Sequence, residues 1–226
     1  MDADDVDAAL LDDSLAFIRR VNVALGYTRA TLRHLERFSR RWLPGQRVTI
    51  LDVATGSADV PVAILRWASR RGFDVRVIGV DRHAATVAAA ARAAAGWGDR
   101  LALVRGDALA LPVGAGGVDY AIASMFLHHL SDADATAALA AMGQVARRGV
   151  IVADLLRHRR AYAWITLFTL ASGAMVKHDA RASVAQAFTK REVLALRERA
   201  GVGFAKYHRH FGHRFVLAGE RRDFEP

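Results

Sequence analysis

The sequence predicts an α/β fold, a doubly wound and mostly parallel sheet of seven strands flanked by helices. Three observations predict it. Between residues 48 and 154, short apolar runs alternate with helix-like segments, which is typical of parallel strands joined by helices. The chain has 226 residues, enough for one domain with a well-buried core. Its apolar content of 53% excludes a disordered chain.

Two amphipathic helices are predicted before the sheet. Residues 10–24 carry apolar side chains at helical spacing, and Gly26 ends this first helix. Thr28 is the predicted cap of a second helix, whose apolar positions are Leu32, Leu35, Phe38 and Trp42. Pro44 and Gly45 then mark the turn that leads into the sheet.

The strands of the sheet and their connections follow in order. The predicted parallel strands are Val48–Asp52, Val75–Asp81, Leu101–Arg105, Val118–Ser124 and Val150–Asp154. The predicted helices between them are Asp59–Arg71, Ala84–Ala95 and Ala133–Ala146. After a last helix over Lys190–Ala200, the segments Gly203–His208 and Arg214–Ala218 are close enough to pair as a hairpin. The C-terminal edge of the sheet is therefore expected to be antiparallel.

Composition excludes several kinds of site. The chain has no cysteine, so it has no disulfide, thiolate metal site or cysteine nucleophile. No other metal-ligand constellation stands out, because the histidines lack carboxylates at ligand spacing. The first residues, MDADDVDAALLDD, are acidic, unlike the basic start of a signal peptide. A cytoplasmic location is therefore expected.

The formal net charge is +9, and nearly all of the basic residues are arginine, since lysine occurs only at Lys177, Lys190 and Lys206. A nucleic-acid-binding protein is expected to gather its positive charge on one stripe. Here the arginines occur as scattered pairs, most of them at the ends of predicted helices, where cations suit the helix dipole. The pattern favours a solvated surface over an anionic partner, and nucleic acid is not expected.

The loop after the first strand, in VTILDVATGSAD (residues 48–59), is the first functional signal. A pyrophosphate would require G-x-G-x-x-G, whereas this loop offers Ala54, Gly56 and Ala58. The sequence also lacks the G-x-x-x-x-G-K-[ST] loop of nucleoside triphosphate binding. Because Asp52 and Asp59 flank the loop, it suits a positively charged ligand better than a phosphate.

Two further acids follow the next two strands. Asp81 ends the second strand, where a carboxylate can accept both hydroxyl groups of a ribose. Asp107 follows the third strand, where it can accept from an exocyclic amine while the Ala108 N–H donates to a ring nitrogen. Ligands of such sheets bind at the carboxyl ends of the strands. The three strand ends together therefore describe an adenosine ligand without phosphates.

These motifs resemble those of class I S-adenosylmethionine-dependent methyltransferases, which have a Rossmann-like fold. LDVATGSAD, VIGVDRH, RGDALALP and VDYAIASMFLHHL stand where the family has its first four motifs, so the resemblance covers residues 48–155. The nearest branch is the ubiquinone- and menaquinone-biosynthesis-like enzymes, in which an Asn and an Arg recur in the N-terminal helices, here Asn22 and Arg29. The sequence departs from the family's first motif at Ala54 and Ala58, which stand in place of glycines. These departures bear on the shape of the loop, because alanine resists a positive φ.

The resemblance implies S-adenosylmethionine as the cofactor and S-adenosylhomocysteine as its product. It implies these cofactor-binding residues: Asp52, Ala54, Thr55, Gly56, Asp59, Asp81, Arg82, Asp107, Ala108, Ser124 and Arg29. We interpret residues 1–226 as one methyltransferase domain. It comprises an N-terminal helical cap (1–44), a cofactor-binding core (45–155), a lid or acceptor region (156–188) and a C-terminal helix with a hairpin (189–226).

The candidate bases are histidines. His128 and His129, in FLHHLSD, follow the fourth strand beside the expected methyl group and could accept a phenol proton. The alternative is that they only brace the next helix, with Ser131 or Asp132 as its N-cap. His178 in the lid region is a rival base. His208, His210 and His213 are interpreted as surface or strand residues.

The acceptor is expected to be a small, apolar, hydroxylated and aromatic molecule of secondary metabolism. The Asn-Pro-Pro-Tyr or Asp-Pro-Pro-Tyr mark of base-amine methylation is absent, and the equivalent place reads Ser124-Met125-Phe126-Leu127. The first hypothesis is O-methylation of a phenol or polyketide, and the second is C-methylation of a quinol ring. Hypotheses of another class are an RNA-directed protein and a non-catalytic cofactor-binding regulator.

The stretch AYAWITLFTLASGAMV, residues 161–176, is almost entirely apolar. It is shorter than the about 20 apolar residues of a membrane-spanning helix. Three interpretations remain open: a lid over the acceptor site, a buried helix, or a segment that lies on a membrane surface.

Overall fold

The computed structural model describes residues 26–168, 181–210 and 212–221. The predicted first helix with Asn22, the C-terminal half of residues 161–176, and His178 lie outside these residues. The helices are α2 (Tyr27–Phe38), α3 (Asp59–Arg71), α4 (Ala84–Ala94), α5 (Asp132–Val145), α6 (Arg159–Phe168) and α8 (Lys190–Arg199), with short 3₁₀ helices η1 (Ser39–Arg41), η2 (Ala95–Arg100) and η3 (Leu127–His129). The strands are β1 (Arg47–Val53), β2 (Asp74–Asp81), β3 (Leu101–Arg105), β4 (Val118–Ser124), β5 (Ala146–Leu155), β6 (Lys206–His210) and β7 (Arg214–Glu220).

The seven strands form one sheet in the order β3-β2-β1-β4-β5-β7-β6. All neighbours from β3 to β5 pair in parallel, whereas β7 pairs antiparallel with both β5 and β6. This confirms the predicted α/β fold and its antiparallel C-terminal edge. The strand order reverses between β1 and β4, and such a reversal opens a crevice at the carboxyl ends of the strands.

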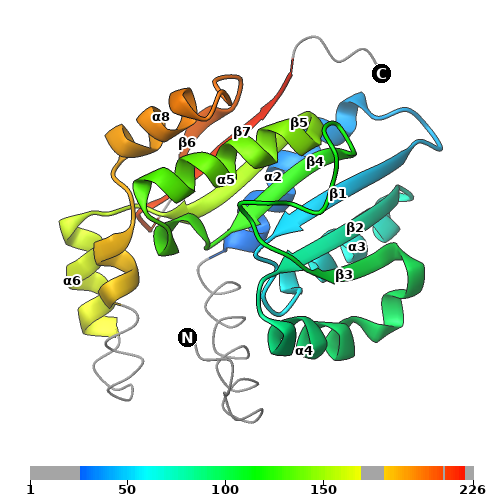
Figure 1. Cartoon of the computed structure of the whole chain (residues 1–226), viewed down its shortest axis with the longest axis horizontal. Helices are drawn as coiled ribbons and strands as arrows, with labels where there is room; N and C mark the ends of the chain where they lie inside the picture. The colour runs from blue at the N-terminus through cyan, green and yellow to red at the C-terminus, as the bar shows by residue number, and fades with distance from the viewer. Residues whose placement is uncertain (1–25, 169–180, 211, 222–226) are drawn as a thin grey trace.

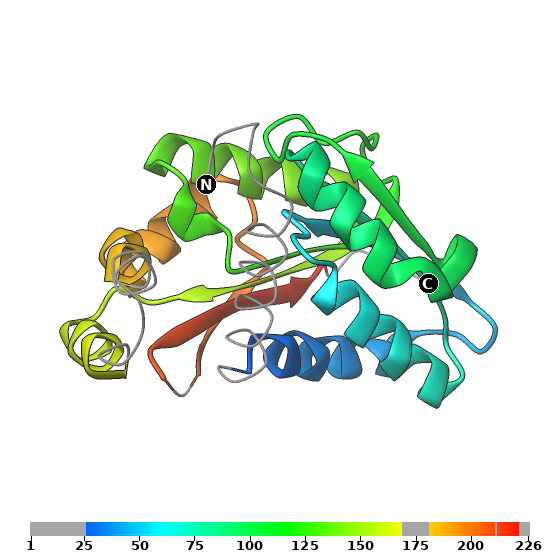
Figure 2. The same ribbon diagram turned by 90° about the horizontal axis from the view of Figure 1, so that it is seen from below.

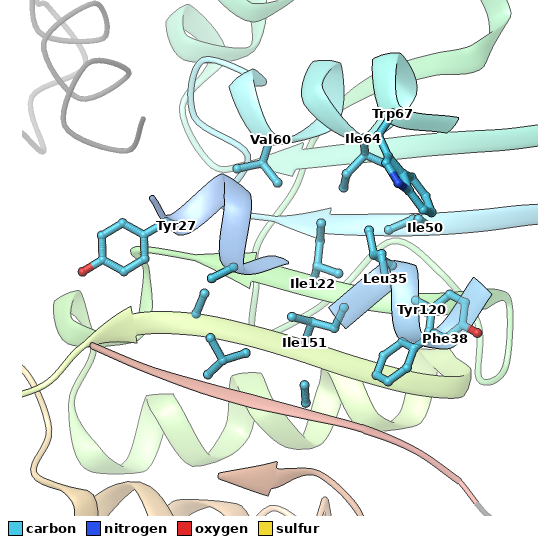
Figure 3. Close-up of a cluster of buried hydrophobic side chains, with 14 of the residues drawn as sticks. Tyr27, Leu35, Phe38, Ile50, Val60, Ile64, Trp67, Tyr120, Ile122 and Ile151 are labelled. Carbon is cyan, nitrogen blue, oxygen red and sulfur yellow. The ribbon is translucent and has the colours of Figure 1, made fainter. Parts of the chain in front are cut away.

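Helices lie on both faces of the sheet. In Figures 1 and 2, α2 and α3 lie on one side and α5 on the other. Alternate strand residues point to the two faces, so Ile50, Ile122 and Ile151 pack against α2 and α3 (Figure 3), while Leu51 and Val152 pack on the face that carries α5 and α8. The two apolar cores together hold the carboxyl ends of β1, β2 and β4 in a fixed arrangement.

Several predicted boundaries differ from the structure by one or two residues, and three further differences matter for the fold. Thr28 is not a helix cap, because Gly26, at a φ of 72°, precedes a helix that already begins at Tyr27. Strand β6 starts at Lys206 rather than Gly203, because a turn closed by the Ala205 N–H and the Val202 carbonyl comes first. Strand β5 starts at Ala146 rather than Val150.

The early start of β5 explains a pair of arginines that the sequence suggested to be a helix end. Arg147 and Arg148 belong to the strand, and both guanidinium groups contact Asp119 of β4, at 2.9 and 2.8 Å. Arg148 and Asp119 are buried, whereas the Arg147 side chain is 48% exposed. The pair lies at the amino end of the parallel strands, so it has a structural role away from the carboxyl edge.

Replacing Arg148 by methionine is expected to lower the free energy of unfolding by about 3 kcal/mol, because the Asp119 carboxylate loses its buried partner. The matched control is Arg147→Met, which removes a contact to the same carboxylate from a half-exposed position and should cost less than about 1 kcal/mol. Urea denaturation of the two variants measures both values. Equal losses would show that burial of the ion pair is unimportant.

Candidate active site at the carboxyl edge of the sheet

The loop between β1 and α3 is held by hydrogen bonds to β2. The Thr55 N–H donates to the Val80 carbonyl at 2.9 Å, and the Gly56 N–H donates to Asp81 Oδ2 at 2.9 Å. Ala54, Gly56 and Ala58 all have a positive φ, of 56°, 54° and 56°. The two alanines thus adopt the left-handed conformation that they were expected to resist, because the anchored loop leaves no alternative.

Gly79 of β2 lies against this loop, and the sequence analysis missed it. A Cβ at Gly79 would lie 2.8 Å from Thr55 Oγ1 and 2.7 Å from Leu103 Cδ2. Strand β2 therefore needs a glycine here so that the loop can pack against it. The signal in the sequence was a glycine inside an apolar strand, which often marks close approach of another backbone.

Ala54→Gly and Ala58→Gly are each expected to raise the free energy of unfolding by about 1 kcal/mol, because a left-handed conformation costs a residue with a Cβ about 1–2 kcal/mol. Ala88→Gly is the matched control. It makes the same chemical change at an exposed position of α4 and should cost about 1 kcal/mol. Chemical denaturation measures all three, and destabilisation by the loop substitutions would contradict the assignment.

Three carboxylates surround the loop. Asp52, at the end of β1, is buried and accepts a hydrogen bond of 2.6 Å from Thr55 Oγ1. Burial raises the pKa of Asp52 to about 8, with further contributions from the neighbouring Asp59 and Asp81 carboxylates. Asp59 begins α3 and accepts from Ser57 Oγ at 3.0 Å. This concentration of acid favours a cationic ligand.

The other strand-end acids lie where the sequence placed them. Asp81 Oδ1 accepts from the His83 N–H at 3.1 Å, which orients the carboxylate at the end of β2. Asp107 follows β3, is exposed, and accepts from the Leu109 N–H at 2.9 Å. Ala108 packs partly against the core, and Arg82 is exposed. A row of acids along successive strand ends suits the hydroxyl and amino groups of an adenosine.

The remaining predicted cofactor residues come from β4 and α2. Ser124 ends β4, and its Oγ lies 3.5 Å from Thr31 Oγ1 of α2. Arg29 is also on α2, but its side chain is exposed. The structure thus brings Ser124 to the same strand edge as the acids, while a role for Arg29 stays a prediction.

His128 and Asp154 form a buried pair at the ends of β4 and β5. His128 Nδ1 lies 2.6 Å from Asp154 Oδ1, and the His128 N–H donates to Asp154 Oδ2 at 3.1 Å. Burial alone would raise the pKa of Asp154, but the His128 imidazole and the N–H groups of Leu155 and His128 lower it below its ordinary value. An ionised Asp154 accepts the Nδ1 proton, which leaves Nε2 as the proton acceptor.

Tyr27 is a second residue that the sequence analysis missed. It begins α2, is 1% exposed, and its hydroxyl finds no hydrogen-bond partner among the described residues. Burial and then the Asp154 carboxylate raise its pKa, so the phenol stays protonated. Figure 3 shows this hydroxyl directed away from the other labelled side chains of the core. A buried donor that has no hydrogen-bond partner among the described residues is a group that a ligand could satisfy.

The other histidines differ from His128 in their exposure or in their position in the fold. The His129 ring is tilted by 38° against that of His128, with ring centroids 4.1 Å apart, but His129 is exposed. His208 and His210 lie on β6, as expected of strand residues, and His213 stacks on His158. Ser131 is the N-cap of α5, as predicted. Among the described residues, no group of three histidine or acidic side chains could hold a metal ion.

The chain leaves the sheet after β5 and comes back beside the end of that strand at Phe188. Leu156 and Phe188 form a parallel bridge, and the Arg157 N–H donates to the Phe188 carbonyl at 2.9 Å. Helix α6, the start of the apolar stretch, lies beyond the carboxyl ends of the strands (Figure 1). Within the described ranges, no helix has the length and apolar character to span a membrane.

Sequence comparison finds one family. Residues 50–149 match the family model described as "Methyltransferase domain". The matched residues run from β1 into β5 and include the loop, Asp81, Asp107 and the histidine pair. No curated protein sequence matches the chain.

Many solved structures share the fold. A protein of Methanococcus maripaludis superposes with a TM-score of 0.65 at 13% identity, over 97% of this chain and 95% of that one. A magnesium protoporphyrin IX methyltransferase of Synechocystis, solved with bound S-adenosylhomocysteine, gives 0.56 at 16%, over 95% and 83%. The CurJ carbon methyltransferase gives 0.60 at 11%, over 80% and 50%. These likenesses show that the fold is that of class I methyltransferases.

Proposed function

We propose that the chain is an S-adenosylmethionine-dependent methyltransferase, and that it methylates an oxygen atom of a small, apolar, hydroxylated acceptor, such as a phenol or a polyketide. The observation that carries the proposal is the buried His128–Asp154 pair. A hydroxyl group is a poor nucleophile until a base takes its proton. In this proposal His128 Nε2 would take that proton, and the contact between Nδ1 and Asp154 supports the role.

The cofactor residues are proposed from the acids of the site. Asp81 would accept the ribose hydroxyls, Asp107 and Ala108 would bind the adenine, and the Asp52 carboxylate would face positive charge. The bound S-adenosylmethionine supplies an electrophilic methyl group. The chain's own contribution is to align the acceptor oxygen and hold its proton, since alignment of the reacting atoms contributes much of the rate of such a displacement.

The surroundings of the pair support an apolar acceptor. Met125 and Phe126, between Ser124 and the histidines, are partly buried and pack against opposite apolar cores. Met125 has a φ of 56°, and its N–H donates to the Ala153 carbonyl at 2.9 Å. This hydrogen bond ties the residue that follows β4 to strand β5. This strand end would therefore offer an acceptor few polar groups.

C-methylation of a quinol ring is the second candidate. The same base would take the proton of a ring hydroxyl while a ring carbon attacks the methyl group. The CurJ carbon methyltransferase shares the fold, so the fold is compatible with this chemistry too.

The deciding experiment supplies S-adenosylmethionine with a ¹³C-labelled methyl group and a panel of phenols, hydroxylated polyketides, quinols and amines. The expected product has an oxygen-bound methyl carbon in its NMR spectrum, and transfer fails in His128→Ala. A carbon-bound methyl group would establish the second candidate. Transfer to the amines alone would overturn both.

A further inference from the structure

Three histidines gather away from the catalytic edge, where α2 lies near the C-terminal strands. His34 of α2 is 3% exposed, and its ring centroid lies 4.7 Å from that of His208 and 6.0 Å from that of His210, both on β6. His34 follows Tyr27 by two helical turns, so the cluster lies about 10 Å further along the helix. The methyltransferase mechanism uses none of these side chains.

The charged groups with the largest effect on the pKa values of these histidines are cations. Four cations lower the pKa values of the three histidines. They are Arg33 and Arg37 of α2, Lys206 of β6 and Arg214 of β7. Glu36, the acid of α2, instead contacts Arg71 of α3.

The protonation of the histidines reflects these surroundings. Burial, then the neighbouring His208 and the arginines, lowers the pKa of His34 to about 4, and burial followed by nearby cations lowers the pKa of His208 and His210. The rings are therefore neutral at pH 7. An anion among them would reverse the local field and favour their protonated forms.

The arginines add a geometric argument. Arg29, Arg33 and Arg37 are exposed and follow one another at a spacing of four residues, so they share one face of α2. Like charges at this spacing destabilise a helix by about 0.2–0.5 kcal/mol per pair. A bound anion would turn this repulsion into attraction. Guanidinium groups are also suited to oxyanions, because their planar N–H groups donate in pairs.

We propose that Arg33, Arg37, His208 and His210 form a binding site for a doubly charged oxyanion, such as the phosphate group of a phosphate monoester. The two arginines supply fixed charge, and the two histidines become donors by taking up protons as the anion binds. His34 closes the site from the core side. The site is separate from the one that binds the methyl donor, and its occupancy would depend on pH.

The test measures sulfate binding to the full-length protein at constant ionic strength, because sulfate keeps its double charge between pH 6 and pH 8. Calorimetry is expected to give a dissociation constant about tenfold lower at pH 6 than at pH 8, since proton uptake is linked to binding. The imidazole NMR signals of His208 and His210 should shift in the same titration.

The variant Arg33→Gln/Arg37→Gln should weaken sulfate binding at pH 6 by about tenfold or more, because two charge-assisted contacts are lost. The control is Arg66→Gln/Arg70→Gln, which removes two exposed arginines at the same spacing from α3 and should bind like the unmodified protein. Equal binding by the two double variants, or equal affinity at both pH values, would overturn the proposal.

Two probes then identify the source of the phosphate. Glycerol phosphate represents a small metabolite, and vesicles that contain phosphatidic acid represent a lipid headgroup, with phosphatidylcholine vesicles as the neutral control. Competition with sulfate by either probe supports the site and assigns its source. Failure of both to compete would overturn the assignment to a phosphate ligand.

Discussion

Replacement of His128 by alanine is expected to lower kcat by about 10²–10⁴-fold, the range typical of a lost general base. The Kd of S-adenosylmethionine should stay within about threefold, because the proposal gives His128 no contact that binds the cofactor. Steady-state kinetics on the identified acceptor and calorimetry with the cofactor measure the two quantities separately.

Two variants show whether the effect belongs to this imidazole. His129→Ala removes the adjacent ring, which is exposed, and should leave kcat within about twofold, because the proposal assigns the proton transfer to the buried His128 alone. Asp154→Asn keeps the shape of the pair but removes the charge that stabilises a protonated His128. It should lower kcat and move the acidic limb of the pH–kcat profile to lower pH, a shift that a purely structural role would not cause. Unchanged turnover in His128→Ala would remove this residue from the mechanism.

Asp52→Asn is expected to change stability and cofactor binding in opposite directions. The pKa of Asp52 is raised to about 8 in the folded protein by burial, whereas in the unfolded chain the carboxyl has its ordinary value near 4. Between these values the folded state holds one more proton, so stability falls as the pH rises from about 4 to about 8. Asparagine cannot ionise and avoids this loss.

The variant should therefore be more stable than the unmodified protein at pH 9, by on the order of 5 kcal/mol, and nearly equal to it at pH 4. Chemical denaturation across this range gives both curves. The matched control, Asp99→Asn, changes an exposed carboxylate paired with Arg76 and should leave the pH dependence unaltered. Parallel curves for Asp52→Asn and the unmodified protein would show that the buried carboxyl is ionised normally.

The same substitution should weaken cofactor binding. If the cationic donor binds to ionised Asp52, the Kd of S-adenosylmethionine falls about tenfold for each pH unit between pH 6 and pH 7, because binding expels the Asp52 proton. In Asp52→Asn this dependence should vanish, and the Kd at pH 8 should rise by about tenfold or more, since a charged contact is lost. Calorimetry in buffers of different ionisation enthalpy detects the expelled proton, and its absence would contradict this role.

The sequence predicted the parts of the fold that depend on hydrophobic periodicity. The bounds of α3, β3 and β4 agree with the structure residue by residue, because each lies between clear turn signals. Strand β5 was placed four residues late, since Arg147 and Arg148 look like exposed residues until Asp119 of the neighbouring strand is known. Buried ion pairs between strands that are distant in sequence leave no local pattern.

The candidate site likewise combines features that have a local sequence pattern with features that depend on residues distant in sequence. The positions of Asp52, Asp81 and Asp107 at strand ends could be predicted, because the end of a strand is a local feature and strand ends meet at one edge. Their contacts with the cofactor stay a prediction. Tyr27 could not be predicted, since only the packing of α2 buries its hydroxyl and exposes it to the charge of Asp154. The sequence placed His128 and His129 equally near the chemistry. The structure distinguishes them, because one is buried against a carboxylate and the other is exposed.

A crystal structure of the protein with S-adenosylhomocysteine tests the central claim most directly, because it locates both the adenosine and the sulfur that carried the methyl group. The account predicts that the ribose hydroxyls bind Asp81, that the adenine lies beside Asp107, and that the sulfur faces the His128 side of the crevice between β1 and β4. An adenosine bound at another edge of the sheet, or a sulfur that faces away from His128, would contradict it.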